Sequence, residues 1–517
     1  MTTPNIIVIL ADDLGFSDAG AFGGEIETPN LDRLAASGVR MSAFYATPRC
    51  SPSRAALLTG RESHSVGIGI LTTDDRPHGY AGSLSLEVPT IAELLKARGY
   101  ATALVGKWHL SSDISAPNET WPTRRGFDEF YGILPGASSY YRPPLYDGER
   151  RVDEQPSDDY YLTDDLSRRA ADFVGRSAQQ ETPFFLYLSY TAPHWPLHAR
   201  EADVASYRDR YRAGWDRLRE ERAERLHELG ITPAVDSARD PEVSEWTDAA
   251  DQEWEAERMA VYAAQVEIMD RGIGRVVATL EAHGVRDDTL IVFCSDNGAC
   301  AEELPFSGRR MNPDICPPLT RDGIEVEVGN EPGIRPGPEA GYSSYGRPWA
   351  HLSNAPFRLY KRWVHEGGIA SPFIANWPAG GIAGGAVAHA PAHITDIVPS
   401  ILDAVGNPVQ RPRASLLEIW REPASRDAPA ERTLCWEHMG NAAARRGRFK
   451  LVREYGRPWE LYDIDADRGE TADIAAKDPG LVADLEAAWQ RWAEASGVIP
   501  WDRVLEDFRQ RGRAVPQ

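Results

Sequence analysis

The 517-residue chain contains only five cysteines, and their number and spacing exclude two common structural roles. They occur at positions 50, 294, 300, 316 and 435, which is an odd number without a Cys-x-x-Cys pair. We therefore expect neither a disulfide framework nor a cysteine-based zinc site.

Long apolar runs and an excess of positive charge are also missing. The apolar run at residues 5–10 is far too short to span a bilayer, and no basic segment with a cleavage site precedes it. The expected location is therefore cytoplasmic. The formal net charge is −22, which argues against nucleic acid or an anionic membrane as a partner. An anionic substrate would have to be attracted by a local basic pocket.

The composition is that of a soluble globular protein, with 42% hydrophobic and 26% charged residues. Apolar segments that predict strands alternate with segments that predict helices. This alternation predicts an α/β fold with a large mixed, mostly parallel sheet flanked by helices. The predicted strands are 5–10, 100–105, 183–190 and 289–295, and the predicted helices are 28–38, 90–98, 164–178 and 259–283.

The pattern changes towards the C-terminus. An apolar stretch at 372–377 and a helix at about 395–405 complete a large domain predicted at 1–414, and a polar linker follows near 411–432. We predict a smaller α+β domain at 415–517, because its short, closely spaced strands indicate a short antiparallel sheet. The strands are predicted at 433–438, 448–453 and 459–463, and a helix follows near 480–495.

The segment from Cys50 to Gly60 reads C-S-P-S-R-A-A-L-L-T-G and predicts a short helix. Cys50 comes just before this helix, Pro52 suits its first turn, and Gly60 ends it. The Cys50 side chain would lie over the unpaired N–H groups at the positive end of the helix, with Arg54 on the same face. These features indicate a nucleophile beside an anion site, whereas a lone cysteine is more often a packing residue.

Polar side chains follow four of the predicted strands. In open α/β sheets ligands bind at the C-terminal edge of the strands, so we expect these side chains to form one site. Carboxylate and amide oxygens are hard donors that suit Ca²⁺ or Mg²⁺ and not zinc. The side chains are Asp12 and Asp13, Lys107 and His109, His194, and Asp296 and Asn297.

The string C-S-P-S-R at positions 50–54 closely resembles the C-x-P-S/T-R signature of the type I sulfatases. The resemblance covers nearly the whole chain, is closest to bacterial arylsulfatases, and implies an alkaline phosphatase-like fold. Further segments match in the same order: D-D at 12–13, G-K-W-H-L at 106–110, A-P-H-W-P at 192–196, D-N-G at 296–298 and the segment around Lys361.

In that family a formylglycine-generating enzyme oxidises the signature cysteine to Cα-formylglycine. The resemblance implies that Cys50 is this precursor. It also implies that the chain cleaves aryl or alkyl sulfate esters of small molecules, giving a phenol or alcohol and inorganic sulfate. A carboxylate-rich site with flexible loop ligands favours Ca²⁺ over Mg²⁺. The implied metal ligands are Asp12, Asp13, Asp296, Asn297 and residue 50.

The resemblance also implies roles for the other matched residues. Asp296 is the base for the attacking hydroxyl, and His194, assisted by Lys361, protonates the leaving oxygen. His109 deprotonates the second hydroxyl of the hydrated aldehyde, so that sulfate leaves by C–O cleavage. Three cations offset negative charge on the sulfate and the nucleophile: Arg54, Lys107 and Lys361.

Two alternative functions stay open. One is a phosphate or phosphonate ester hydrolase of the same superfamily, but such relatives that share formylglycine tend to replace the K-x-H pair present here as Lys107 and His109. The other is a metal- and sulfate-binding pseudoenzyme, which would follow if Cys50 stayed unmodified.

The organic part of the substrate is not fixed by these motifs. Loops at 132–160 and 301–350 are expected to form a rim around the site. Their aromatic side chains are candidates to stack on an aryl ring: Tyr140, Tyr141, Tyr146, Tyr342, Tyr345 and Trp349.

Overall fold

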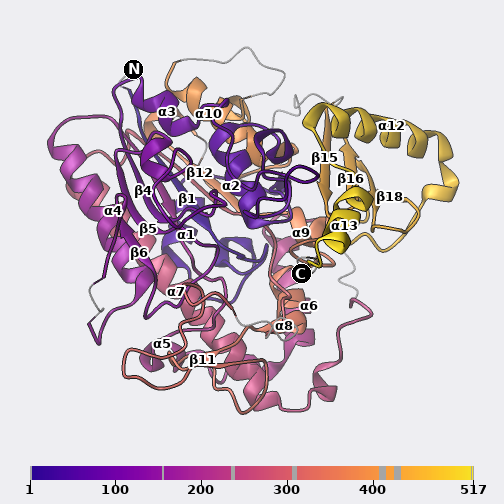
Figure 1. Ribbon diagram of the computed structural model, residues 1–517. Helices are drawn as coiled ribbons and strands as arrows, with labels where there is room; N and C mark the ends of the chain where they lie inside the picture. Colours follow the sequence, from indigo (N-terminus) through magenta and orange to yellow (C-terminus); the bar gives the residue numbers. More distant parts are fainter. Residues whose placement is uncertain are drawn as a thin grey trace.

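The computed structural model describes residues 3–153, 157–234, 239–304, 311–382, 384–406, 415–423, 432–513 and 515. The predicted end of the large domain at 414, much of the predicted linker and short parts of the predicted rim loops lie outside these residues. Figure 1 shows a large body formed by most of the chain, with a smaller C-terminal unit in yellow beside it.

Ten strands of the described chain form one sheet, in the order β13-β2-β12-β9-β1-β8-β4-β5-β6-β7. At its centre, β1 (Asn5–Ala11) is parallel to both β8 (Phe184–Ser189) and β9 (Thr289–Ser295). β4 (Ala101–Lys107) is parallel to β8 and to β5 (Glu129–Ile133). The prediction of a mixed, mostly parallel sheet is therefore confirmed.

The outer strands of this sheet are mostly short. β12 (Phe373–Asn376) runs antiparallel to β9 and to β2 (Val39–Met41), and β13 (Ala386–Ala388) is parallel to β2. At the other edge, β6 (Leu145–Asp147) and β7 (Arg150–Arg151) continue the sheet with antiparallel pairing.

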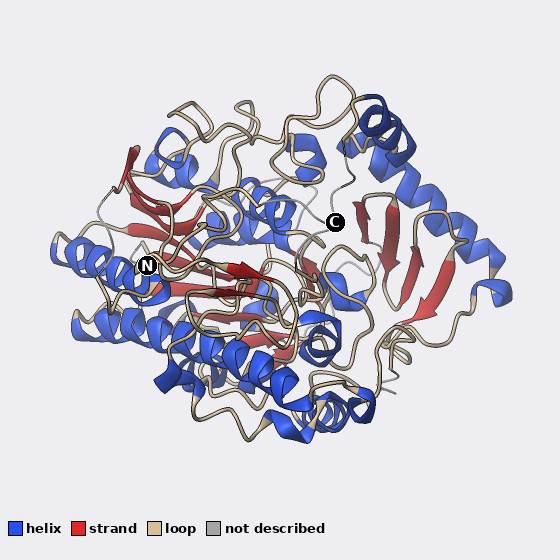
Figure 2. Ribbon diagram, turned by 60° about the horizontal axis from the view of Figure 1, so that its bottom comes forward, coloured by secondary structure: helices blue, strands red, loops and turns tan. Residues whose placement is uncertain are grey.

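Helices cover both faces of the sheet (Figures 1 and 2). Side chains of β1 alternate between two apolar clusters, since Ile7 and Ile9 belong to one and Ile6 and Val8 to the other. The first cluster includes residues of α1 (Pro29–Ala36), α4 (Leu162–Gln179) and α7 (Gln252–Ala282). The second includes residues of α2 (Cys50–Thr59), α3 (Ile91–Lys96) and α10 (Ile397–Ala404).

The remaining elements that precede the C-terminal sheet are short or lie in the connections. None of the described helices combines the length and the apolar character that crossing a bilayer requires. The helices are α5 (Glu201–Val204), α6 (Trp215–Glu228), α8 (Gly346–Ser353), α9 (Glu366–Ile369) and α11 (Leu417–Arg421). The strands are β3 (Phe44–Tyr45), β10 (Glu327–Val328), β11 (Gly341–Tyr342) and β14 (Ala392–His393).

The C-terminal unit contains the predicted antiparallel sheet and the predicted helix. β15 (Thr433–His438), β16 (Asn441–Arg446), β17 (Phe449–Arg453) and β18 (Glu460–Asp463) pair in sequence order, and α12 (Pro479–Ser496) packs on them. Two elements were not predicted: β16 and the final helix α13 (Trp501–Gln510). The three alanines at 442–444 explain the first omission, because alanine has a low preference for strands.

The boundary at 414/415 stays a prediction. Two residues that follow it, Leu417 and Trp420 of α11, are buried in an apolar cluster of the large domain. Trp420 stacks on Phe373 of β12 with ring centroids 5.7 Å apart.

A buried cluster of charges joins the two domains. Glu366 of α9 accepts from Lys450 Nζ of β17 at 3.0 Å and from Arg468 Nε at 2.9 Å. Lys450 also contacts Glu470 at 2.8 Å, and Tyr45 donates its hydroxyl to Glu366. Since Lys450 and both glutamates are fully buried, these ion pairs depend on one another.

Replacing Lys450 with methionine is expected to lower the free energy of unfolding by about 3–5 kcal/mol, because two buried carboxylates lose a cation. Burial disfavours ionised Glu366, but Lys450 and Arg468 hold its pKa at about 2, below the usual 4.5. A carboxyl whose pKa is lowered on folding stabilises fully above its unfolded pKa and loses that contribution as the pH falls. The deficit should therefore be largest near neutral pH and shrink towards pH ~2.

Urea titration of wild type and variant at several pH values between about 3 and 7 measures this effect. The matched control is Lys96→Met, which removes one member of an exposed pair with Asp128 and should cost no more than about 1 kcal/mol. Equal losses in the two variants, or a Lys450→Met deficit independent of pH, would contradict the prediction.

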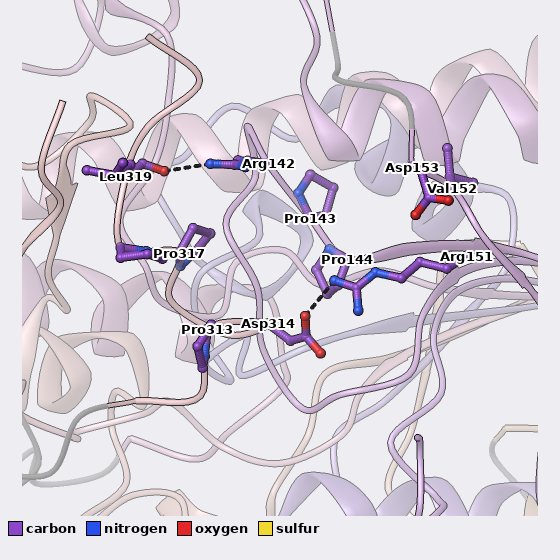
Figure 3. A pocket seen from close by; sticks show the side chains of 11 residues that line it. Arg142, Pro143, Pro144, Arg151, Val152, Asp153, Pro313, Asp314, Pro317 and Leu319 are labelled. Atoms are coloured by element: carbon purple, nitrogen blue, oxygen red, sulfur yellow. Dashed lines mark hydrogen bonds and ion pairs between the residues drawn. The ribbon is translucent and has the colours of Figure 1, made fainter. Parts of the chain in front are cut away.

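The two predicted rim loops contact each other around a pocket of about 410 Å³ (Figure 3). Arg142 donates to the Leu319 carbonyl at 2.9 Å, and Arg151 pairs with Asp314 at 2.6 Å. Of the described residues that line this pocket, none is a predicted site residue. The two loops therefore form a pocket whose described lining does not include the predicted site residues.

The aromatic side chains of these loops are not available to a substrate. All six candidate rings are buried, with Tyr342 and Trp349 at 0% exposure. Tyr345 stacks on Tyr262 of α7 with ring centroids 4.4 Å apart. The suggestion that they stack on an aryl substrate is therefore wrong, because these rings fill the interior, where their large apolar area is most stabilising.

Candidate active site

The polar side chains expected at one edge of the sheet do meet there. Asp12 and Asp13 follow β1, Lys107 is the last residue of β4, and Asp296 follows β9. Lys107 Nζ lies 2.6 Å from Asp12 Oδ2, and the Asp13 N–H donates to Asp296 Oδ1 at 3.1 Å. These contacts join three strands at the C-terminal edge, the position that favours ligand binding in such sheets.

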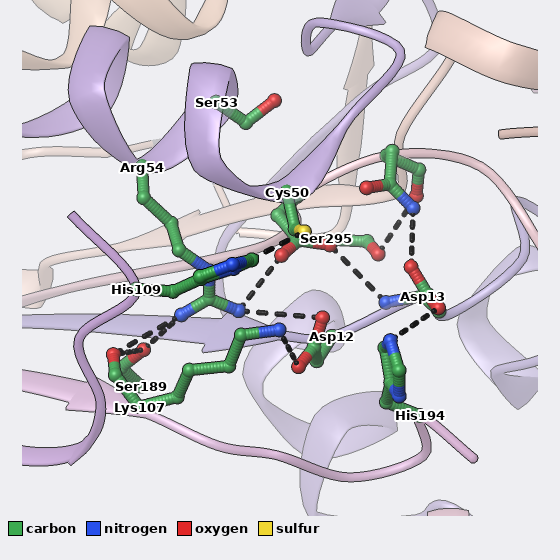
Figure 4. A network of polar contacts seen from close by, with 12 residues as sticks. Asp12, Asp13, Cys50, Ser53, Arg54, Lys107, His109, Ser189, His194 and Ser295 are labelled. Carbon is green, nitrogen blue, oxygen red and sulfur yellow. Dashed lines mark hydrogen bonds and ion pairs between the residues drawn. The ribbon is translucent and has the colours of Figure 1, made fainter. Parts of the chain in front are cut away.

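Helix α2 brings Cys50 and Arg54 to the same edge (Figure 4). The helix begins at Cys50 itself and not after it, so the sulfur lies on the first turn. Arg54, one turn later and fully buried, pairs with Asp296 Oδ2 at 2.7 Å and lies 3.4 Å from Asp12 Oδ1. It also donates to Ser189 at the end of β8. The expected cation therefore lies beside the cysteine, held between two carboxylates.

His109 faces Cys50. Its Nδ1 lies 3.4 Å from Cys50 Sγ and 3.1 Å from the Ser51 hydroxyl oxygen. Burial, followed by the charges of Lys107 and Arg54, holds the pKa of His109 well below its usual value. The imidazole is therefore neutral, as a base acting on residue 50 would need to be.

Lys361, His194 and Asp13 form the opposite side of the site. Lys361 Nζ lies 2.9 Å from Asp13 Oδ2 and 3.5 Å from His194 Nε2, and that nitrogen is 3.4 Å from Asp13. His194 Nδ1 lies 2.7 Å from the Trp195 carbonyl oxygen, which can only accept, so Nδ1 carries a proton. The Nε2 atom therefore faces the cation and the carboxylate.

The charges of the site move its pKa values in different directions. Burial lowers the pKa of His194 to about 3, Asp13 opposes this shift, and Lys361 and Lys107 add to it. Burial and the nearby Asp12 raise the pKa of Asp296 to about 7 despite Arg54. Burial opposes ionisation of Asp13, but Lys361 and His194 hold its pKa below the usual value. Within this cluster Asp296 is therefore held closer to its protonated form than Asp13 is.

The donor set fits a hard cation. Asp12, Asp13 and His194 each offer a ligand atom, and these atoms lie within 4.8 Å of one another. Asp12 Oδ1 and Asn297 Oδ1 are buried and accept no hydrogen bond from the described residues. Arg54 lies 3.4 Å from Asp12 Oδ1, but a buried oxygen without a hydrogen bond is costly, and a cation would satisfy both of these oxygens. The predicted ligands Asp12, Asp13, Asp296 and Asn297 thus suit Ca²⁺ or Mg²⁺.

Three further residues of the site were not found from the sequence. Arg49, next to Cys50, pairs with Glu302 at 3.0 Å, and Trp195 donates to the same carboxylate at 2.9 Å. Burial opposes ionisation of Glu302, yet Lys361 and Arg49 lower its pKa to about 2. Charged residues at ordinary loop positions give no sequence signal, since most of them are solvated.

Gly136 is required by the position of His109. A Cβ atom at Gly136 would lie 2.5 Å from His109 Cε1, which is closer than any real contact. His109 itself has φ +52°, an unusual conformation for a residue other than glycine. The close approach of the two residues fixes the ring that faces Cys50.

Comparisons with known proteins find relatives over most of the chain. The sequence model of the family described as Sulfatase matches residues 4–407. An uncharacterised sulfatase of Schizosaccharomyces pombe is 32% identical, with 98% of this chain and 96% of the relative covered. An arylsulfatase of Klebsiella aerogenes is 33% identical over 78% of this chain and 87% of its own.

A solved structure supports the same assignment over the full length. The protein Ps i-CgsB in complex with k-i-k-neocarrahexaose superimposes with a TM-score of 0.71 at 25% identity, covering 99% of this chain and 98% of its own. The family model covers most of the large domain, and the Schizosaccharomyces pombe relative and the solved structure cover nearly the whole chain. The chain therefore belongs to the sulfatase family.

Proposed function

We propose that the chain hydrolyses sulfate esters, aryl sulfates among them, with residue 50 as the nucleophile after oxidation of Cys50 to formylglycine. The observation that carries the proposal is the position of Cys50 Sγ, which lies 3.4 Å from His109 Nδ1 and one helix turn before Arg54. The partner for maturation would be a formylglycine-generating enzyme. When hydrated, formylglycine supplies two hydroxyls on one carbon, one for attack at sulfur and one for release of sulfate.

Two residues are suited to move protons at position 50. Asp296, with a pKa of about 7, is suited to accept a proton from the attacking hydroxyl. His109, neutral and within 3.4 Å of the Cys50 sulfur, is suited to deprotonate the second hydroxyl. Attack by the first hydroxyl and release of sulfate through the second would then each have a base of their own.

Three cations would stabilise the anionic sulfate as charge develops. Arg54 and Lys107 lie on the side of Asp12, and Lys361 lies on the side of Asp13. All three are buried, where a fixed charge acts more strongly than in water. They supply the local positive field that the overall charge of −22 does not.

The predicted ligands Asp12, Asp13, Asp296 and Asn297 would hold Ca²⁺ in preference to Mg²⁺, since Ca²⁺ tolerates irregular oxygen sets. Such a cation supplies charge neutralisation and lowers the pKa of a bound hydroxyl. Asp12 Oδ1 and Asn297 Oδ1, which are buried and accept no hydrogen bond from the described residues, support this assignment.

His194 and Lys361 would deliver the proton to the leaving oxygen. His194 is neutral, because burial and Lys361 lower its pKa. An anionic sulfate bound beside it would raise that pKa again. The contact between the two side chains, at 3.5 Å, allows them to act together.

The His194→Ala variant tests this role and, with it, the proposed reaction. Its loss of kcat/KM should be less than about tenfold for nitrophenyl sulfate, whose phenolate leaves without a proton, and about 10²–10⁴-fold for an alkyl sulfate. The measurement is kcat/KM for both esters in wild type and variant.

A matched control is His198→Ala. His198 is another buried histidine, and its Nδ1 accepts from the Tyr140 N–H at 3.4 Å. This variant should slow both esters by the same factor. Equal losses in His194→Ala would remove His194 from the acid role, and a wild-type enzyme that cleaves phosphonate esters but no sulfate ester would overturn the proposed function.

A further inference from the structure

A cleft of about 780 Å³ adjoins the active site between the large domain and the C-terminal domain. Two residues that line it touch or neighbour the site: Lys361, whose Nζ contacts Asp13, and Arg49, which precedes Cys50. Glu454 and Arg457, between β17 and β18, line the same cleft. The proposed reaction steps use only Lys361 of this lining, and the cleft is large enough for the organic part of an ester.

Arg362 occupies an unusual position in this cleft. It directly follows Lys361 and has φ +87°, a conformation that costs energy for any residue other than glycine. Its N–H donates to the Pro48 carbonyl at 2.7 Å, and its carbonyl accepts from Asn441 of β16 at 3.4 Å. These two contacts fix the strained backbone, and they hold Arg362 beside the segment that carries Arg49.

The Arg362 guanidinium has no ion pair or hydrogen bond to any described residue, and its Nε is buried without a partner. Two other arginines of the cleft differ in this respect. Arg49 pairs with Glu302 at 3.0 Å, and Arg347 pairs with Glu242. A half-buried cation without a counter-ion is unfavourable, because desolvation is not offset by attraction.

The surroundings of Arg362 further disfavour its positive charge. Burial and then the like charge of Arg49 lower the pKa of Arg362. Glu302 and Glu454 oppose this shift, but neither carboxylate forms an ion pair with Arg362. Arg362 lacks the counter-ion that Glu302 gives Arg49, so an oxyanion bound in the cleft would complete its ion pair.

We propose that Arg362, next to Arg49, binds a second anionic group on the organic part of the substrate, either a carboxylate or a further sulfate. The preferred substrates are then sulfate esters that carry an oxyanion besides the sulfate that is cleaved. This inference rests on the proposed sulfatase function and names the substrate class of the same site. The Trp363 ring, which also lines the cleft with the Arg362 guanidinium 5.9 Å from its centroid, offers a flat face to the carbon skeleton.

The test uses phenyl sulfates substituted at the meta or para position with carboxymethyl, sulfomethyl or neutral carbamoylmethyl groups. The methylene group insulates the phenol from the substituent, so the esters differ mainly in charge. Wild-type enzyme should show a kcat/KM about 10- to 100-fold higher for at least one anionic ester than for its neutral partner. The carboxymethyl and sulfomethyl members distinguish the two kinds of oxyanion.

In Arg362→Gln the ratio of anionic to neutral kcat/KM should fall to about one, and Arg362→Lys should retain part of the preference. The matched control Arg347→Gln should keep the wild-type ratio, because Arg347 already has Glu242 as its counter-ion. Hydrolysis of all esters without preference, or a preference that survives in Arg362→Gln, would overturn the inference alone. Hydrolysis of no ester at all would overturn the proposed function as well.

Discussion

Replacement of Cys50 by alanine is expected to reduce kcat/KM for an aryl sulfate by at least about 10⁴-fold while the fold survives. The reaction loses its nucleophile, and His109 loses the group that it faces at 3.4 Å. The structural cost should be small, because Cys50 is the first residue of α2 and alanine is the best helix former. Only one sulfur atom is removed, and the Ser51 hydroxyl still contacts His109 at 3.1 Å.

The measurement is kcat/KM together with thermal unfolding, and Cys435→Ala is the control for loss of a buried thiol far along the sequence. Cys435 lies on β15 of the C-terminal domain and should be dispensable for turnover. Mass spectrometry of the wild-type peptide that contains Cys50 should show conversion of the thiol to the aldehyde. Wild-type rates in Cys50→Ala would contradict the nucleophile assignment, and an unmodified, inactive wild type would favour the pseudoenzyme.

Much of the fold could be predicted because its central strands carry their own signal. β1, β8 and β9 are buried on both faces, so their sequences are nearly continuous apolar runs. The predicted helix at 28–38 corresponds to α1 (Pro29–Ala36), which begins with a proline. These signals are local and do not depend on distant partners.

Elements that depend on distant partners could not be predicted. β16 is rich in alanine and forms a strand because β15 and β17 pair with it on either side. The cluster of Glu366 and Lys450 joins residues 84 positions apart, which no local pattern indicates. The same holds for the loop aromatics, since an isolated ring in a loop does not show whether it faces solvent or the interior.

The residues of the site also fall into those that could be assigned from the sequence and those that could not. Residues within short motifs, such as Cys50 and His109, could be assigned because the motifs resemble a family and follow strand ends. Arg49 and Arg362 could not be assigned, although each adjoins a motif residue. Arg49 is distinguished by its ion pair with Glu302, and Arg362 by its positive φ and its unpaired guanidinium. All of these are properties of the folded chain.

Asp13→Asn is expected to remove most of the bound cation and to lower kcat/KM by about 10³-fold or more. Asp13 is 1% exposed, accepts from Asn297 at 2.6 Å and pairs with Lys361 at 2.9 Å. Asparagine keeps the size of the side chain but removes the charge that attracts a hard cation. It also leaves Lys361 without its carboxylate, so we expect a modest loss of stability in addition.

Elemental analysis of dialysed protein should find calcium, or less favourably magnesium, in wild type and little of either in Asp13→Asn. Added Ca²⁺ should raise the Tm of wild type and not of the variant, because only the native site binds it. The control is Asp270→Asn, which alters a buried carboxylate that accepts from the Leu31 N–H at 2.8 Å at the start of α1. That variant should keep its metal even if it is less stable. Stoichiometric zinc without calcium or magnesium in wild type, or an unchanged metal content in Asp13→Asn, would contradict the assignment, because a hard cation held by carboxylates cannot tolerate the loss of a central one.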